Sequence, residues 1–152
     1  MKKLFGLLYF FFICLLTFAQ NPCPQVIPAL QQWKGAKGSL SLPTQGNIII
    51  NPSNEEALAS TAFILIEDLK ELMGWEYTIS TGKAQKNGIY LSLSEPDEQL
   101  GKEGYTLSIM NKVSIEAPTT QGVFWGTRTL LQMLHRQKAK LTKGTIRDWP
   151  EF

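Results

Sequence analysis

The sequence contains few of the residues on which most active sites depend. Its 152 residues include one histidine, His135, and two cysteines, Cys14 and Cys23. So few histidine and cysteine side chains cannot supply the four ligands of a zinc site. The sequence also lacks the glycine-rich loops that bind phosphate and the Gly-x-Ser-x-Gly motif of serine hydrolases. We therefore expect no metal and no cofactor, and we interpret His135 as a surface residue at the end of a helix.

The N-terminus has the form of a secretory signal peptide. Basic Met1-Lys2-Lys3 precedes an almost wholly apolar run from Leu4 to Phe18, and Ala19 follows as a small residue at which cleavage can occur. A membrane anchor is the alternative, but a helix over 4–19 would span about 24 Å, less than the roughly 30 Å of a hydrocarbon core. We predict a signal peptide over 1–19, export to the periplasm or the extracellular space, and no stable membrane span after cleavage.

Removal of this leader changes the charge balance. The full chain has 15 basic and 13 acidic residues, for a net charge of +2. Lys2 and Lys3 leave with the leader and no acidic residue does, so the charges of the remaining chain cancel. A neutral chain gives no electrostatic reason to bind nucleic acid, and we predict no such partner. Cys23 then remains without a disulfide partner, in a predicted tether over 20–25, where an idle thiol is the simplest interpretation.

Two segments have the apolar periodicity of amphipathic helices. The first buries one stripe: Leu58, Ala62, Leu65, Ile66, Leu69 and Leu72. Ser53 and Glu56 have the spacing of a capping box, and Gly74 suits a left-handed residue just after the helix. Glu67, Asp68, Lys70 and Glu71 lie on the opposite side, and we interpret them as a solvated face.

The second helix is predicted to begin after Pro118, capped by Thr119 or Thr120. Its apolar stripe consists of Val123, Thr127, Leu130, Leu131 and Leu134. Glycine inside a helix costs about 1 kcal/mol relative to alanine, so we expect close packing at Gly126.

Four segments alternate between apolar and polar residues, as strands with one buried face do: 75–80, 89–94, 105–109 and 113–117. Met110-Asn111-Lys112 is predicted to join the last two as a hairpin. Ile48–Ile50 is apolar throughout, which suits a strand that is covered on both faces or that ends under a helix. We also expect a turn flanked by Gly35 and Gly38, a strand over 39–42 and a last strand over 144–148. The predicted fold is an α+β two-layer sandwich over 26–148, in which a mixed, mostly antiparallel sheet packs two helices on one face.

The tryptophans are the remaining candidates for binding. Trp75 follows the buried alternation of its strand, so we assign it to the core. Trp125 lies off the main stripe of its helix, and Trp149 lies beside the C-terminus with Phe152. We predict that Trp125, Trp149 and Phe152 contact another domain. Asp97-Glu98 follows a proline and is interpreted as an exposed turn.

A series of motifs occurs in one order along the chain: Glu103-Gly104-Tyr105-Thr106-Leu107, Val113-Ser114-Ile115-Glu116-Ala117, Gly122–Gln132 and Ile146-Arg147-Asp148-Trp149-Pro150. This series resembles the N-terminal accessory domain of glycoside hydrolase family 20, the β-N-acetylhexosaminidases. The opening segment, Val26–Trp33, is also similar to the start of that domain in some bacterial members.

The resemblance implies that 149–152 begins a connection to a catalytic (β/α)₈ barrel that is absent here. In the family, the catalytic Asp-Glu pair and the arginine that grips the sugar belong to that barrel. The resemblance therefore assigns no catalytic and no substrate-binding residue to this chain. It implies that the barrel of the same polypeptide is the partner and that glycans ending in N-acetylhexosamine bind to the barrel. Glu151 departs from the arginine that many members have after the proline, which leaves the substrate subgroup open.

Three alternatives remain at this point. A family 84 N-acetylglucosaminidase begins with a similar domain. A free-standing glycan-binding module would use exposed tryptophans to stack on sugar rings. A structural or assembly domain without a ligand would instead expose a sizeable apolar patch when it is alone.

Overall fold

The computed structural model describes residues 20–150. The predicted signal peptide and Phe152 lie outside these residues. The described chain forms, in order, β1 (Gln32–Ser41), β2 (Gln45–Ile50), the short 3₁₀ helix η1 (Pro52–Asn54), α2 (Glu55–Met73), β3 (Glu76–Thr81), β4 (Ile89–Leu93), β5 (Tyr105–Ile109), β6 (Val113–Ala117), α3 (Thr120–Gln137) and β7 (Lys140–Asp148).

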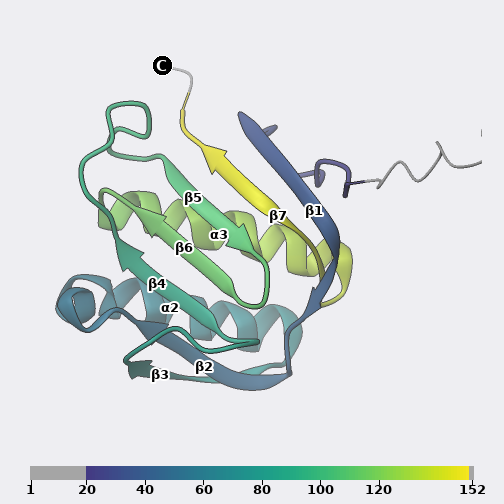
Figure 1. Cartoon of the computed structure of the whole chain (residues 1–152). Helices are drawn as coiled ribbons and strands as arrows, with labels where there is room; N and C mark the ends of the chain where they lie inside the picture. The colour runs from purple at the N-terminus through teal and green to yellow at the C-terminus, as the bar shows by residue number, and fades with distance from the viewer. Residues whose placement is uncertain (1–19, 151–152) are drawn as a thin grey trace, which may run out of the picture.

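The strands form one sheet in the order β1-β7-β5-β6-β4-β2-β3, and α2 and α3 lie together against one face of it (Figure 1). This arrangement confirms the predicted α+β fold with a mixed sheet. The pairs β2–β3, β2–β4 and β4–β6 are parallel, and the pairs β5–β6, β5–β7 and β1–β7 are antiparallel. The sheet thus has as many parallel as antiparallel strand pairs, whereas the prediction was a mostly antiparallel sheet. The helix α2 carries the chain back across the sheet between β2 and β3, and such a crossover makes neighbouring strands parallel.

The core lies between the sheet and the two helices. From α2 it takes Leu58, Ala62, Leu65 and Leu69, and from α3 it takes Val123, Leu130, Met133 and Leu134. Ile48, Ile49 and Ile50 are all buried, as their continuous apolar run predicted. Trp75 is 4% exposed and belongs to the core, also as predicted. Leu72, in contrast, lies outside the core and is 55% exposed, because it falls in the last turn of α2.

The two helices differ in how they begin. At α3, the hydroxyl of Thr119 accepts a hydrogen bond from the amide of Gly122 at 3.0 Å, which confirms a predicted cap. At α2 the predicted capping box is wrong. The side chain of Asn51 caps the preceding η1 by accepting a hydrogen bond from the amide of Ser53. Asn54 occupies the N-cap position of α2, but its side chain accepts a hydrogen bond from the amide of Leu93 on β4 and none from α2. The C-terminal prediction holds, since Gly74 has a φ of 68°.

The first strand also differs from the prediction. Gly35 and Gly38 do not flank a turn, because β1 continues through them as one strand paired with β7, with a register irregularity between Gly35 and Ser39. Asn21 explains part of this geometry. Its backbone bonds Ala36 and its side chain bonds the carbonyls of Gly38 and Lys143. The residues before β1, 20–31, are thereby attached to β1 and β7 at the irregularity, and we call them the N-terminal segment.

No helix within residues 20–150 combines the length and apolar character needed to cross a bilayer.

Candidate functional site

A groove of about 530 Å³ lies where the N-terminal segment, α3 and the end of β7 meet. Trp125 lines it from α3 and is 43% exposed, and Trp149 lines it from the residues just after β7. The structure therefore brings together two of the three aromatic residues that were predicted to form an interface. The third, Phe152, lies outside the described residues.

The N-terminal segment forms one wall of this groove. Gln132 on α3 holds the segment by bonding both the amide and the carbonyl of Ile27, each at 2.9 Å. Farther along, the amide of Gln31 donates to Oδ1 of Asp148 at 2.9 Å. Sequence reasoning missed Gln132 and Asp148, because a single glutamine on a helix and a single aspartate at a strand end carry no periodic signal.

A buried hydrogen-bond cluster forms the floor of the groove. The hydroxyl of Tyr105 on β5 lies 2.6 Å from Oγ1 of Thr129 on α3 and donates to Oδ2 of Asp148 at 3.0 Å. Burial raises the pKa of the Tyr105 hydroxyl above its ordinary value, so the phenol is a neutral donor at physiological pH. Asp148, the last residue of β7, is thus hydrogen-bonded both to Gln31 before β1 and to Tyr105 on β5.

Arg128 lies on the side of the groove that faces α2. Its Nη1 is 2.6 Å from Oδ2 of Asp68, although the two groups are not aligned as a hydrogen bond. Its guanidinium carbon lies 4.7 Å from the centre of the Phe124 ring, and its Nε and Nη2 donate to Thr127 Oγ1 at 3.2 Å. Of the predicted solvated face, Glu67, Lys70 and Glu71 are exposed as expected. Asp68 differs, because its side chain is 26% exposed and lies against Arg128 of the neighbouring helix.

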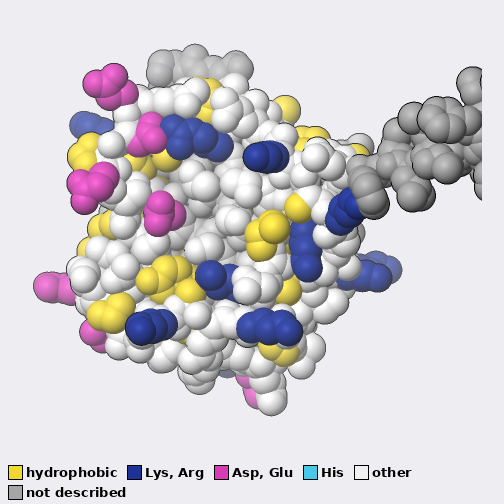
Figure 2. All heavy atoms as spheres, viewed as in Figure 1, with side chains coloured by type: hydrophobic (Ala, Val, Ile, Leu, Met, Phe, Trp, Pro, Cys, Tyr) yellow, Lys and Arg dark blue, Asp and Glu magenta, His cyan; other side chains and the backbone are white. Residues whose placement is uncertain are grey.

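Exposed apolar side chains also lie on the outside of α2, on both sides of the ion pair with Arg128. Ile64 and Leu72 lie one turn before and one turn after Asp68 on α2 and are 41% and 55% exposed. We call Ile64, Asp68, Leu72, Phe124 and Arg128 the helix face. On the opposite face of the sheet, Figure 2 shows basic and acidic side chains with smaller hydrophobic patches between them.

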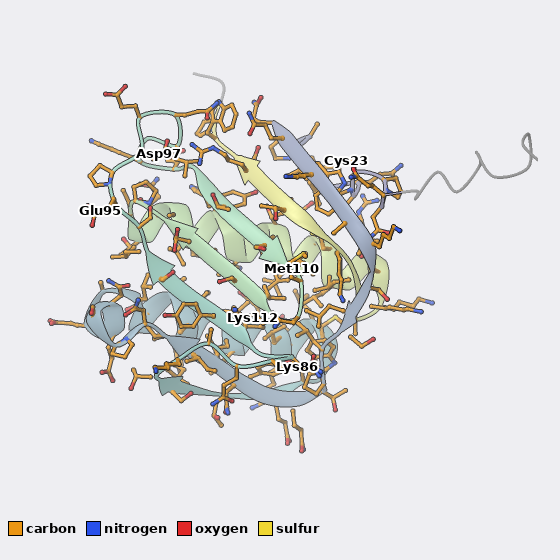
Figure 3. The ribbon with its side chains drawn as sticks, viewed as in Figure 1. Cys23, Lys86, Glu95, Asp97, Met110 and Lys112 are labelled. Atoms are coloured by element: carbon orange, nitrogen blue, oxygen red, sulfur yellow. The ribbon has the colours of Figure 1, made fainter. Side chains whose placement is uncertain are left out.

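A second hollow of about 320 Å³ lies on the other side of Trp149 and Pro150, against residues 98–103. Arg147 at the end of β7 holds this loop by an ion pair of 2.7 Å with Asp97. The hydrogen bond from Arg147 lowers the pKa of the Asp97 carboxyl. Figure 3 shows Asp97 in the loop beyond the end of β4. Asp97 was interpreted as part of an exposed turn, and the structure assigns it this ion pair.

The chemistry available in the groove is that of binding. Its two carboxylates are already engaged, since Asp148 bonds Tyr105 and Gln31, and Glu103 accepts from Gln121 at 2.6 Å. Across residues 20–150, no three histidine, cysteine or carboxylate side chains gather in a way that could hold a metal ion. Both carboxylates that line the groove therefore take part in contacts within the described domain.

The model of a known family, described as glycosyl hydrolase family 20, domain 2, matches residues 23–149. The chain belongs to this family. The predicted resemblance to family 20 is thereby confirmed.

Individual relatives of the family 20 domain agree with this assignment. The lacto-N-biosidase of Bifidobacterium bifidum is 29% identical over 131 residues, a match that covers 85% of this chain and 11% of that protein. The solved structure of the GH20 β-N-acetylhexosaminidase from Streptomyces coelicolor A3(2) is 25% identical with a TM-score of 0.66, and the match covers 88% of this chain and 28% of that one. The structure of CpGH84D, at 16% identity and a TM-score of 0.65, shows the shared fold alone. The chain therefore spans only a small part of each of these relatives.

Proposed function

We propose that this chain is the non-catalytic N-terminal accessory domain of an exported β-N-acetylhexosaminidase. Its function is to support a catalytic (β/α)₈ barrel that hydrolyses terminal N-acetylhexosamine from glycans. In this proposal, residues 1–19 are a cleaved signal peptide, 20–25 a tether, 26–148 the accessory domain and 149–152 the start of the connection to the barrel. The observation that carries the proposal is that Trp125 and Trp149 line one groove at the point where the chain leaves β7.

The proposed occupant of the groove and the helix face is the polypeptide that follows Phe152. The chain corresponds to 28% of the Streptomyces coelicolor enzyme, so a large further part exists in that relative. A domain joined through Trp149 and Pro150 would begin within the groove itself. Its nearest surface would then be α3, where Trp125 is exposed, and beyond it α2 with Ile64 and Leu72. Burial of apolar area of this kind is a principal favourable contribution to the docking of domains.

The first experiment compares the 152-residue chain with a protein extended through the coding sequence after Phe152. A chromogenic N-acetylglucosaminide is the substrate. We expect no hydrolysis by the short chain and hydrolysis by the extended protein. Hydrolysis by the short chain, or a reading frame that encodes no barrel after Phe152, would contradict the proposal.

The second experiment tests the docking surface within the extended protein. Trp125→Ala and Trp149→Ala should lower the thermal stability of the barrel and its activity, because both remove apolar contact between the domains. Met110→Ala is a matched control, since Met110 is 45% exposed, close to the 43% of Trp125, but lies in the β5–β6 turn outside the groove. Equal effects of Trp125→Ala and Met110→Ala would exclude the groove as the docking site.

A second candidate function is glycan binding by the groove itself. The same observation favours it, because two tryptophans and the polar side chains of Arg128 and Gln132 converge there, and tryptophan can stack on a sugar ring. Titration of the 152-residue chain with chitooligosaccharide tests this candidate, with Trp125→Ala and Trp149→Ala as controls. Saturable binding that both substitutions abolish would support it, and a flat titration leaves docking as the function of the groove.

A further inference from the structure

Asn87 is the one asparagine of this chain that glycine follows. The other five precede residues that hinder or prevent attack by the next backbone nitrogen: Asn21-Pro22, Asn47-Ile48, Asn51-Pro52, Asn54-Glu55 and Asn111-Lys112. Proline has no amide hydrogen to lose, and the other three residues carry a side chain beside the attacking nitrogen. Gly88 has neither obstacle.

The loop before β4 leaves the side chain of Asn87 accessible. Asn87 is exposed and has a φ of 57°, a left-handed conformation that asparagine tolerates. Among the described residues, no hydrogen bond engages its side-chain amide. Only a long hydrogen bond of 3.3 Å, to the carbonyl of Gln85, restrains the amide of Gly88. The electrophile and the nucleophile of one reaction are therefore adjacent, and neither of these two groups makes a short hydrogen bond within the described residues.

We propose that Asn87 is a site of spontaneous deamidation. The backbone nitrogen of Gly88 loses its proton and attacks Cγ of Asn87. A bond forms between that nitrogen and Cγ, the bond from Cγ to Nδ2 breaks, and the nitrogen leaves as ammonia with the transferred proton. Water then opens the five-membered imide at either carbonyl and leaves aspartate or isoaspartate. The net change is the consumption of one water and the release of one ammonia, without an oxidant, a reductant or an enzyme.

The two products differ in their effect on the fold. Two backbone hydrogen bonds hold this loop to the β5–β6 turn, one from Asn87 to the carbonyl of Asn111 at 2.8 Å and one from Val113 to the carbonyl of Gly88 at 3.0 Å. Isoaspartate inserts an extra carbon into the backbone between these two bonds, so both cannot keep their geometry. Aspartate keeps the backbone and adds a negative charge at the end of the sheet where Lys86 and Lys112 lie (Figure 3).

Gly88 offers a matched control. A Cβ at this position would lie 3.4 Å from the carbonyl oxygen of Gln85 and 3.8 Å from that of Asn47, which are ordinary contacts. Gly88→Ala should therefore fold as the parent chain does, while its methyl group shields the attacking nitrogen. The substitution separates the chemistry of deamidation from the stability of the loop.

The experiment incubates the purified chain at mildly alkaline pH, which favours loss of the amide proton, and follows it by peptide mass mapping. We expect the exchange of NH₂ for OH in the peptide that contains Asn87, and labelling of that peptide by isoaspartyl methyltransferase. We expect loss of both signals in Gly88→Ala, with unchanged circular dichroism. The same comparison in urea covers the case in which the variant does not fold. An unmodified Asn87 peptide, equal modification in Gly88→Ala, or earlier modification at Asn111 would overturn the proposal.

Discussion

The side-chain amide of Gln132 bonds the backbone amide and the backbone carbonyl of Ile27, although the two residues lie 105 positions apart in the sequence. One amide group thus satisfies a donor and an acceptor of the N-terminal segment at once. The contact fixes that segment against α3 and gives the groove its second wall. The shape of the proposed docking site therefore depends on a helix residue that does not belong to the core.

The first prediction concerns this contact. Gln132→Ala removes two solvent-exposed hydrogen bonds, and a typical hydrogen bond contributes about 0.5–1.5 kcal/mol. We expect faster hydrogen exchange at the amides of residues 27 and 31 and a loss of about 1 kcal/mol in the free energy of unfolding. Gln121→Ala is the control, since Gln121 is on the same helix but bonds Glu103. Unchanged exchange at Ile27 in Gln132→Ala would show that the segment is held by other contacts.

The elements of this fold were more predictable than its groove. The stripe of α3, its Thr119 cap and the β5–β6 hairpin follow from residues near one another in sequence, where periodicity and turn chemistry are informative. The long strand β1 was not predictable, because Gly38 signals a turn but here accommodates an irregularity opposite β7. The walls of the groove depend on contacts between distant segments, such as Gln31 with Asp148, which leave no local pattern.

The second prediction concerns Gly126, for which the sequence predicted close packing. A Cβ at this position would lie 2.5 Å from Cγ2 of Ile115, which is fully buried on β6, and 3.2 Å from the Tyr105 ring. Alanine should gain about 1 kcal/mol in helix propensity. Overpacking of a rigid core costs about 1–3 kcal/mol and should exceed that gain.

We therefore expect Gly126→Ala to lower the free energy of unfolding in urea, with an unchanged dependence on denaturant. Ser60→Ala on α2 is the control, because Ser60 is exposed and only the propensity gain applies there. A Gly126→Ala variant more stable than the parent chain would show that α3 can move away from β6 at little cost.

The third prediction concerns alkaline pH. Burial raises the pKa of Tyr77 to about 12 and that of Tyr105 further, against an ordinary value of 10.0. A raised pKa in the folded state means that the unfolded chain loses its proton first. Stability is therefore fully present below pH 10.0 and is lost as the pH rises toward the folded-state pKa values. Each tyrosine should contribute a slope of about 1.4 kcal/mol per pH unit in that window.

Urea unfolding between neutral pH and pH 12 measures this slope. Tyr105→Phe should remove about half of the slope of stability against pH. Tyr77→Phe should remove the other half at pH values below the pKa of Tyr77, which is about 12. Tyr105→Phe should also be less stable than the parent chain at neutral pH, because Asp148 and Thr129 lose a buried partner. Equal slopes in the parent chain and in both variants would show that neither phenol is protected from ionisation by the fold.

The fourth prediction uses the ion pair between Asp68 and Arg128 as a reporter of docking. In the 152-residue chain, each side chain is 26% exposed, so water screens the pair. A double-mutant cycle with Asp68→Ala and Arg128→Ala should then give a coupling of about 0.2–1 kcal/mol. If a following domain covers the helix face, the same charges lose that water. Removing one partner then leaves a buried, unpaired charge, which costs about 3–5 kcal/mol.

We therefore expect a several-fold larger coupling in the extended protein than in the isolated chain. The cycle of Asp97→Ala with Arg147→Ala serves as the comparison, because both side chains of that ion pair are 31% exposed and neither residue belongs to the helix face or lines the groove. Added salt should weaken the Asp68–Arg128 coupling in the isolated chain and leave it largely unchanged in the extended protein, since a pair without water is poorly screened. The same coupling and the same salt dependence in both proteins would mean that the following domain leaves the helix face in water, and docking would then be limited to the groove.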